Sequence, residues 1–412
     1  MPKAILIPET VGRRPEEIIA TALSTVREHL GMDIAYLSEF VDGRSVYRAV
    51  DAPGLDHLLA VDDSRDLNDV YCQHILDGRL PELIADTSAE PLCMEMPITF
   101  EAPIGSHVSV PIRRPDGSPY GMFCCLSPRA NPTLTPRDLS VMRAFADLAA
   151  EQVNGALIER DTHAAKVAAI RAVIETHALS IAYQPIVDLS TGMVQGFEAL
   201  SRFNTEPYRT PDLWFADAAS VGMGVYLELA AIELALMGLT DLPEHIYLSL
   251  NAGPDTIASG RLGEVLEGKP LNRLVLEITE HDQIDVEQPF LDELLIWRDR
   301  GMNIAIDDAG AGYSGLQQIL RISPDILKLD RSLVTGIHAD PARRSLGAAM
   351  VHFAAETGAR IVAEGIETAE ECSTLQTLGM HCGQGWYFGR PGDLTAALAP
   401  CQLPRFGDGS GS

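Results

Sequence analysis

The sequence predicts a multidomain protein, in which an α+β domain precedes a modified (β/α)₈ TIM-type barrel with one antiparallel strand. Three observations lead to this prediction. The chain has 412 residues, a length typical of two or three domains. Within the first 158 residues, two pairs of strand-like segments meet at Asp-Gly dipeptides, as in antiparallel hairpins. From Ser180 onward, strand-like segments are separated mostly by helical ones, the pattern of an α/β barrel.

The N-terminal domain is expected at residues 10–158. Its closing helix should begin after Thr135, a suitable N-cap that is followed by Pro136 in the first turn. Asp42-Gly43 and Asp116-Gly117 should form the hairpin turns, because both central residues of a type I′ turn need positive φ. An opening helix, a sheet and a closing helix are typical of a small sensor-type domain. The expected opening helix is 15–30, the strands are 34–40, 45–50, 107–113 and 120–126, and a short helix lies at 67–76.

Residues 159–179 are expected to form a connecting helix. Apolar residues recur at alternating spacings of four and three from Met142 to Ile174, and such a seam suits a coiled coil in a homodimer. Arg160 and His163 interrupt the middle of the seam. Two successive helices that pack on their own domains are therefore an equally good interpretation.

The barrel is expected at residues 180–400, followed by a flexible tail at 401–412. Its first two strands are joined only by Ser190-Thr191-Gly192, which is too short for a crossover helix, so this pair must be antiparallel. The expected strands are 181–189, 193–203, 246–251, 274–280, 303–308, 326–330, 360–364 and 385–389, and the helices are 211–238, 255–267, 288–300, 315–320, 341–357 and 369–378.

The composition excludes several classes of partner. Acidic residues number 58 against 31 basic ones, a formal net charge of −27, and no basic arm or stripe interrupts this acidity. We therefore expect no DNA or RNA polymer and no membrane surface as a partner. The seven cysteines are scattered without a Cys-x-x-Cys pair, and neither a signal peptide nor a spanning segment is indicated. A cytoplasmic protein is the expectation.

Polar side chains gather at the C-terminal ends of the expected barrel strands, which converge on one mouth. Carboxylates at this density imply divalent cations, Mg²⁺ or Mn²⁺, because unpaired carboxylates so close together would repel one another. An adjacent Asp-Asp pair can serve two metals, and two metals are a common apparatus for displacement at phosphorus. Each residue alone could be a solvated rim residue, but coincidence at so many strand ends is implausible. The residues are Glu198, Asn251, Glu277, Glu280, Asp307, Asp308, Lys328 and Glu364, and Gln384 is expected to open the last strand.

Residues 181–391 resemble the EAL domain, a family of cyclic di-GMP phosphodiesterases built on a modified barrel. The named motif is Glu198-Ala199-Leu200, with Arg202 two residues beyond it. The remaining motifs are Tyr183-Gln184-Pro185, Glu277-Ile278-Thr279-Glu280, Asp307-Asp308-Ala309-Gly310-Ala311-Gly312-Tyr313-Ser314, Lys328-Leu329-Asp330, Ala363-Glu364-Gly365-Ile366-Glu367 and Gln384-Gly385.

The resemblance implies two-metal hydrolysis of one phosphodiester bond of cyclic di-GMP, which gives linear pGpG by in-line attack of water. Lys328, Glu364 and Glu198 are then the catalytic residues, with Lys328 beside the attacking water and Glu364 as ligand or base. Gln184, Arg202 and Gln384 are implied to bind the substrate, and Glu280 to anchor the loop that follows the two aspartates. The implied ligands are Glu198, Asn251, Glu277 and Asp307 for the first metal, and Asp307 and Asp308, with Glu364 nearby, for the second.

The sequence departs from the EAL pattern at two places. Ala309 stands where the family usually has an aromatic residue, and residues 203–212 lack the usual Trp-x-x-Pro-x-x-Gly pattern. Neither departure removes a metal ligand. A receptor that binds cyclic di-GMP without cleaving it is the alternative function, and an unrelated two-metal barrel hydrolase is a third.

The first 158 residues resemble a GAF sensor domain, which implies a phosphodiesterase regulated by a signal. The resemblance rests on residues 106–112, the Asp116-Gly117 hairpin and residues 121–125. Its ligand is open: Cys72 or Cys124 could hold a chromophore or react with oxidants, and His74 or His107 could ligate haem. Buried cysteines and hydrogen-bonded histidines of an ordinary core are the competing interpretation.

Overall fold

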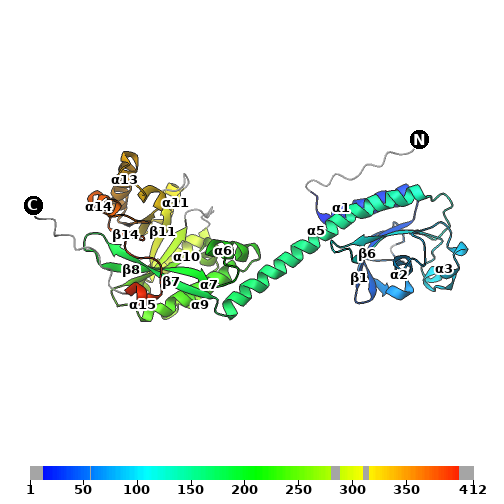
Figure 1. The fold of residues 1–412 in the computed structure, drawn as a ribbon, viewed down its shortest axis with the longest axis horizontal. Helices are drawn as coiled ribbons and strands as arrows, with labels where there is room; N and C mark the ends of the chain where they lie inside the picture. Colours follow the sequence, from blue (N-terminus) through cyan, green and yellow to red (C-terminus); the bar gives the residue numbers. More distant parts are fainter. Residues whose placement is uncertain (1–12, 56, 280–287, 310–314, 399–412) are drawn as a thin grey trace, which may run out of the picture. The chain divides into compact units, whose positions relative to one another are not determined.

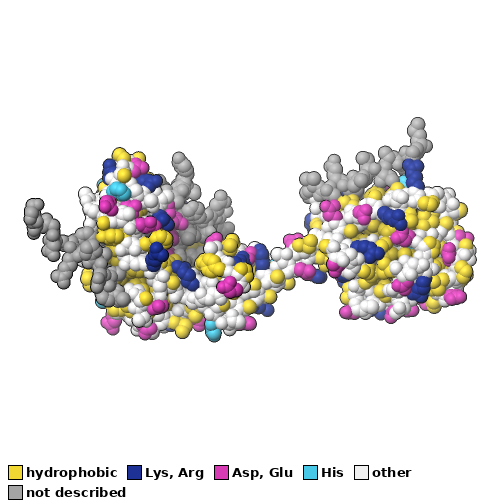
Figure 2. Space-filling view, in the orientation of Figure 1, with side chains coloured by type: hydrophobic (Ala, Val, Ile, Leu, Met, Phe, Trp, Pro, Cys, Tyr) yellow, Lys and Arg dark blue, Asp and Glu magenta, His cyan; other side chains and the backbone are white. Residues whose placement is uncertain are grey.

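The computed structural model describes residues 13–55, 57–279, 288–309 and 315–398. The chain forms two compact units, residues 1–162 and 163–412, and each is described by itself (Figure 1). On the face seen in Figure 2, the Lys and Arg side chains of both units are interspersed with acidic and hydrophobic ones. No helix of the described residues is both long and apolar enough to cross a membrane.

The first unit is the predicted α+β domain. Helix α1 (Pro15–Leu30) packs against a six-stranded sheet of order β3-β2-β1-β6-β5-β4. Side chains of strand β1 alternate between two cores. Ala35 and Leu37 pack in a core with the helices α1 and α5 (Pro136–Glu175), whereas Ile34 and Tyr36 pack in a second core with α2 (Tyr71–Leu76) and α3 (Pro91–Glu95) (Figure 1). The strands are β1 Ile34–Val41, β2 Arg44–Asp51, β3 Ser64–Asp66, β4 Leu83–Ile84, β5 Ser106–Arg113 and β6 Pro119–Ser127.

The two hairpin turns differ from one another. Between β1 and β2, Asp42 and Gly43 have φ of 49° and 75°, as a type I′ turn requires. The prediction of the same turn between β5 and β6 is wrong, because five residues separate these strands. Gly117 has φ of 85° there, and the Asp116 side chain accepts a hydrogen bond from Ser118 N, so an Asx turn shapes the loop.

Helix α5 is continuous from Pro136 to Glu175. Its N-terminal part, including Met142 and Val153, packs in the core of the first unit. Its C-terminal part, including Ile170 and Val173, packs in a core of the second unit. The apolar seam is thus used at both ends by the chain's own domains, as the second interpretation expects, but the two packed parts belong to one continuous helix and not to two. Dimerisation through the exposed middle of the helix stays a prediction.

The second unit is a closed eight-stranded barrel in which sequence neighbours pair and β14 returns to β7. Strand β7 runs antiparallel to both β8 and β14, and the other pairs are parallel. The prediction of one antiparallel strand is therefore confirmed. The strands are β7 Leu179–Asp188, β8 Val194–Phe203, β9 Tyr247–Asn251, β10 Leu274–Thr279, β11 Asn303–Ala309, β12 Ile326–Leu329, β13 Arg360–Ala363 and β14 Cys382–Gln384.

Three predicted elements of the barrel need correction. The helix expected at 211–238 is two helices, separated at Gly222 with φ of 70°, and the one expected at 255–267 is likewise divided, near Gly260. The strand expected at 385–389 is wrong, because β14 ends at Gln384 and the chain then turns, with Tyr387 N donating to Ile366 O. The helices are α6 Pro211–Ser220, α7 Gly224–Met237, α8 Pro254–Ala258, α9 Gly263–Leu266, α10 Gln288–Asp299, α11 Gly315–Ile322, α12 Arg331–Val334, α13 Pro341–Thr357, α14 Ala369–Leu378 and α15 Leu394–Leu398.

Candidate active site

A buried lysine lies at the centre of the barrel mouth. Lys328 on β12 is 1% exposed, and its ammonium group is surrounded by carboxylates from four other strands or strand ends. Such a cluster is stable only if a cation compensates the negative charges. Nζ lies 2.7 Å from Glu364 Oε1, 2.8 Å from Glu277 Oε2, 3.1 Å from Asp307 Oδ1 and 3.3 Å from Glu198 Oε2.

Asp307 and Asp308 are brought to the same side of the sheet by an irregularity of β11. In a regular strand, adjacent side chains point to opposite faces. Here the register against β12 shifts between Ile306 and Ala309, and Asp308 takes a φ of 55°. Aspartate tolerates this left-handed conformation better than most residues. Consequently both carboxylates lie near Glu364, with ligand oxygens of all three within 4.8 Å of one another.

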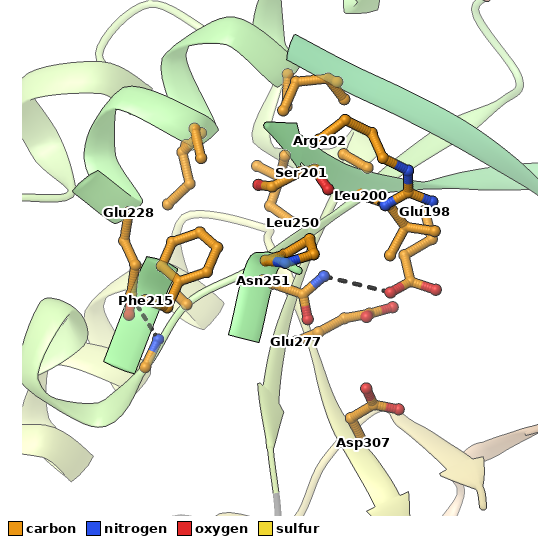
Figure 3. A pocket seen from close by; sticks show the side chains of 18 of the residues that line it. Glu198, Leu200, Ser201, Arg202, Phe215, Glu228, Leu250, Asn251, Glu277 and Asp307 are labelled. Carbon is orange, nitrogen blue, oxygen red and sulfur yellow. Dashed lines mark hydrogen bonds between the residues drawn. The ribbon is translucent and has the colours of Figure 1, made fainter. Parts of the chain in front are cut away.

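Hydrogen bonds from neighbouring side chains orient the carboxylates. Ser249 Oγ on β9 donates to Glu277 Oε1 at 2.5 Å, and Asn251 Nδ2 donates to Glu198 Oε1 at 3.3 Å (Figure 3). Gln384 Nε2 donates to Glu198 Oε2 at 2.6 Å and to Gln184 Oε1 at 3.0 Å. Neighbouring groups that fix a ligand in this way commonly tune metal affinity.

The charges of this cluster are strongly coupled. Burial raises the pKa of Glu277 to about 8, and the neighbouring Glu198 acts in the same direction. Burial also raises the pKa of Glu364 well above its ordinary value, although Lys328 opposes the shift. For Lys328, burial alone would lower the pKa, but the carboxylates outweigh it and hold the pKa well above its usual range. One ammonium is thus too little positive charge for the carboxylates that surround it.

The donor set fits two hard divalent cations. One group of carboxylate oxygens comes from Glu198, Glu277 and Asp307, and the other from Asp307, Asp308 and Glu364. Within each group the ligand atoms lie within 4.8 Å of one another, and Asp307 belongs to both. Carboxylate oxygens without sulfur or imidazole suit Mg²⁺ and Mn²⁺.

Two cavities open from this centre, and both are bordered by Glu198, Leu200 and Asp307. The first has a volume of about 570 Å³ and extends between β8, β9 and the helices α6 and α7, with mostly apolar walls that include Phe215 (Figure 3). The second has a volume of about 280 Å³ and lies towards β13 and β14. Residues that line the second are Gln184, Arg331, Glu364, Gly365, Glu367, Gln384, Gly385 and Trp386.

The structure gathers the site residues predicted from the sequence, with one outside its described residues. Arg202 lines the first cavity, where its Nη1 donates to Ser201 O at 2.8 Å, and Asn251 lines the same cavity. Gln184 and Gln384 line the second, but Gln384 closes the last strand instead of opening it. Glu280, the predicted loop anchor, lies outside the described residues. Ala309, which replaces the usual aromatic residue, is fully buried in the barrel core.

Several residues near the site were not predicted from the sequence. Ser249 contacts Glu277, and Glu228 on α7 accepts a hydrogen bond from Gly253 N at 2.7 Å, beside Asn251. A Cβ on Gly253 would approach Glu228 Oε1 to 2.9 Å, so the glycine permits this contact. Glu228 is one of two acidic residues in the otherwise apolar helix α7, and the sequence alone does not separate it from a surface charge.

Comparison with known proteins identifies the same two regions. A family model described as the EAL domain matches residues 167–391, and one described as the GAF domain matches residues 12–153. Cyclic di-GMP phosphodiesterase RocR of Pseudomonas aeruginosa is 30% identical over 230 residues, which are 51% of this chain and 56% of the relative. The probable cyclic di-GMP phosphodiesterase PdeG of Escherichia coli is 30% identical over 222 residues, 51% of this chain and 44% of the relative.

A solved structure agrees with these matches. The structure described as "PaMucR Phosphodiesterase, c-di-GMP complex" is 27% identical, has a TM-score of 0.52, and covers 57% of this chain and 99% of that one. The chain spans less than two thirds of the length of the curated relatives named above. The EAL model, however, covers more than half of the chain itself. The chain therefore belongs to the EAL domain family and carries a GAF domain on its N-terminal side.

Proposed function

We propose that the barrel is a metal-dependent phosphodiesterase that hydrolyses one phosphodiester bond of cyclic di-GMP to give linear pGpG. The observation that carries this proposal is the pair of carboxylate groups that share Asp307 and adjoin Lys328. The relatives RocR and PdeG, named as an established and a probable cyclic di-GMP phosphodiesterase, support the substrate. The complete carboxylate set favours an enzyme over a receptor that only binds the nucleotide.

The residues divide the work between metal binding and charge stabilisation. Glu198, Asn251, Glu277 and Asp307 would hold one Mg²⁺ or Mn²⁺, and Asp307, Asp308 and Glu364 the other. Two such cations, when bound, neutralise phosphate oxygens and lower the pKa of water. Lys328 is placed to stabilise negative charge that develops at phosphorus, because its ammonium is fixed in a site shielded from solvent. Glu364, whose side chain is 18% exposed, is placed to accept a proton from the attacking water.

Substrate is held from both cavities. Arg202 offers a planar guanidinium, which suits forked contact with a phosphate. Arg202 lines the first cavity, and its Nη1 donates to Ser201 O at 2.8 Å. Gln184 and Gln384 present amide groups in the second cavity, and the buried Gln384 Oε1 has no hydrogen-bond partner among the described residues. A substrate amino or hydroxyl group can supply that partner.

The test is incubation of the full chain with cyclic di-GMP and either Mg²⁺ or Mn²⁺, with pGpG followed by chromatography. Appearance of pGpG that stops on addition of EDTA supports the proposal. Tight binding of cyclic di-GMP without turnover under both metals would instead favour the receptor. Glu267, which is exposed and lines neither cavity, provides the matched control: Glu267→Ala should keep the activity that Glu198→Ala removes.

For the GAF domain, we propose a sensory role that alters the activity of the barrel, in a cytoplasmic homodimer. Its ligand is unassigned. Cys72, Cys124 and His107 are all buried in the first unit, and each is at most 1% exposed. Mass spectrometry of natively purified protein would identify a bound chromophore, haem or small molecule. Sedimentation that gives a monomer at micromolar concentration would remove the dimer from the proposal.

A further inference from the structure

One carboxylate of helix α7 borders the first cavity, on the inner face of the helix. Residues three and four apart lie on the same face of a helix, and Glu228 shares its face with Ala231 and Ile232, which line the same cavity. Glu233, the other acidic residue of α7, is exposed. A charged group on the inner face of an apolar helix is costly unless a polar partner compensates it. Glu228 therefore needs such a partner.

The partner is the turn that follows strand β9. Gly253 N donates to Glu228 Oε2 at 2.7 Å, which is the contact drawn as a dashed line at Glu228 in Figure 3. Gly253 is the N-cap of α8, and the start of a helix leaves backbone N–H groups without intrahelical partners. A Cβ on Gly253 would come within 2.9 Å of Glu228 Oε1, so a side chain here would displace the carboxylate.

The same turn carries Asn251, the one proposed metal ligand with an amide side chain. Asn251 ends β9 and is exposed, and its Nδ2 donates to Glu198 Oε1 at the long distance of 3.3 Å. Packing therefore does not fix the amide, and the path of the backbone after β9 decides where it lies. Ala252 N donates to Glu277 O at 3.1 Å, and the next residue is held by Glu228. The backbone beyond Asn251 is thus held from both β10 and α7.

We propose that Glu228 is a positioning residue for the first metal site, and that it acts through the backbone at Gly253 on the amide oxygen of Asn251. This inference rests on the proposed function, in which Asn251 is a ligand of that site. Removal of Glu228 leaves the Gly253 N–H without its carboxylate and lets the turn move, so the amide is no longer held for a hard cation. A contact that only stabilises the start of α8 is the competing interpretation. It predicts a loss of stability without a loss of metal affinity.

Calorimetric titration of the full chain with Mn²⁺ alone tests the proposal. Glu228→Ala should weaken binding at one of the two sites about 10- to 100-fold, the loss typical when a group that orients a ligand is removed. Glu228→Gln should keep most of the affinity, because its carbonyl oxygen can accept the same hydrogen bond from Gly253 N. Glu233→Ala, at the exposed position of the same helix, is the matched control and should leave both sites unchanged. Wild-type affinity at both sites in Glu228→Ala would overturn the proposal.

A double-mutant cycle separates positioning from other effects of the substitution. Asn251→Ala removes the ligand that Glu228 positions, so adding Glu228→Ala to it should weaken Mn²⁺ binding no further. Losses that multiply in the double variant would refute the proposal, because Glu228 would then act independently of Asn251. Gly253→Ala perturbs the contact from the other side and should weaken the same site. Gly253 has φ of −74°, which alanine adopts without strain, so this variant acts through the displaced carboxylate.

The outcomes also distinguish this inference from the proposed function. If the wild-type chain binds no Mn²⁺, the proposed function fails and this inference fails with it. If wild type binds two ions and cleaves cyclic di-GMP while Glu228→Ala keeps the wild-type affinity for Mn²⁺, only the role of Glu228 is refuted. A lower Tm of Glu228→Ala in EDTA with unchanged Mn²⁺ affinity would reduce Glu228 to a cap of α8. Gly253→Ala, which removes no group, supplies the same test if Glu228→Ala does not fold.

Discussion

Replacement of Lys328 by methionine tests whether the lysine is the internal counter-ion of the metal-free site. Methionine keeps an unbranched side chain, one heavy atom shorter, and removes the charge. The ammonium is 1% exposed and lies within 3.3 Å of oxygens from four carboxylates, which Lys328→Met would leave without their cation. Removal of one partner from a buried ion pair typically costs about 3–5 kcal/mol.

We therefore expect the metal-free variant to lose about 3–5 kcal/mol of stability, which corresponds to a fall of roughly 6–20 °C in the Tm of the barrel. Mn²⁺ should raise the Tm more in Lys328→Met than in wild type, since the cation replaces the missing charge. Differential scanning calorimetry in EDTA and in Mn²⁺ measures both effects. Lys269→Met, at an exposed position of the same unit, is the control and should change little.

Equal Tm values for wild type and Lys328→Met in EDTA would refute this reasoning. Such a result would mean that the carboxylates do not need the ammonium for stability. Activity gives a separate readout, because Lys328→Met should lack turnover even when Mn²⁺ restores its Tm. A variant that is both stable and active would remove Lys328 from the proposed chemistry.

Three other predictions follow from the same contacts. Asp307→Ala should abolish turnover and weaken binding of Mn²⁺ at both metal sites, whereas Asp308→Ala should weaken binding at only one of them. Titration calorimetry that finds about two Mn²⁺ ions bound per Asp307→Ala chain would contradict this prediction. Gln384→Ala should weaken Mn²⁺ binding about 10- to 100-fold, because its Nε2 orients Glu198 at 2.6 Å, and unchanged affinity would limit Gln384 to substrate contact. Burial lowers the pKa of His107 from 6.5 to about 4. The folded state therefore loses stability as the pH falls from 6.5 towards 4, by about 2 kcal/mol at pH 5. His107→Leu should remove that part of the acid sensitivity, which Tm measurements at pH 7.5 and pH 5 would show.

Local patterns in the sequence were sufficient for most of the barrel. The three-residue link Ser190-Thr191-Gly192 required an antiparallel pair, and the structure has it. The prediction of a strand at the apolar residues 386–388 was wrong. Phe388 is buried, but the backbone forms a turn there, with Phe388 N donating to Gly385 O. A periodic pattern records which side chains are buried and does not by itself record the backbone path.

The site was predictable to the extent that strand ends identify it. The carboxylates were found because each closes a strand-like run, and closure of the barrel brings such ends together. The sequence pattern could not place the adjacent Asp307 and Asp308 on one side of the sheet, because neighbouring side chains of a regular strand point to opposite faces. Only the register shift in β11 brings the two carboxylates to the same side.

The acidity of the chain is compatible with an anionic substrate once the charges at the mouth are considered. In the proposed complex, five carboxylates carry five negative charges: Glu198, Glu277, Asp307, Asp308 and Glu364. Lys328 and two divalent cations supply five positive ones. The centre would then be neutral, Arg331 is already paired with Glu367, and Arg202 would remain to contact a phosphate. Affinity for cyclic di-GMP should therefore depend steeply on the concentration of the divalent metal and only weakly on added monovalent salt. The compensating charges lie at the centre of the site, and screening by salt ions acts chiefly on exposed charges.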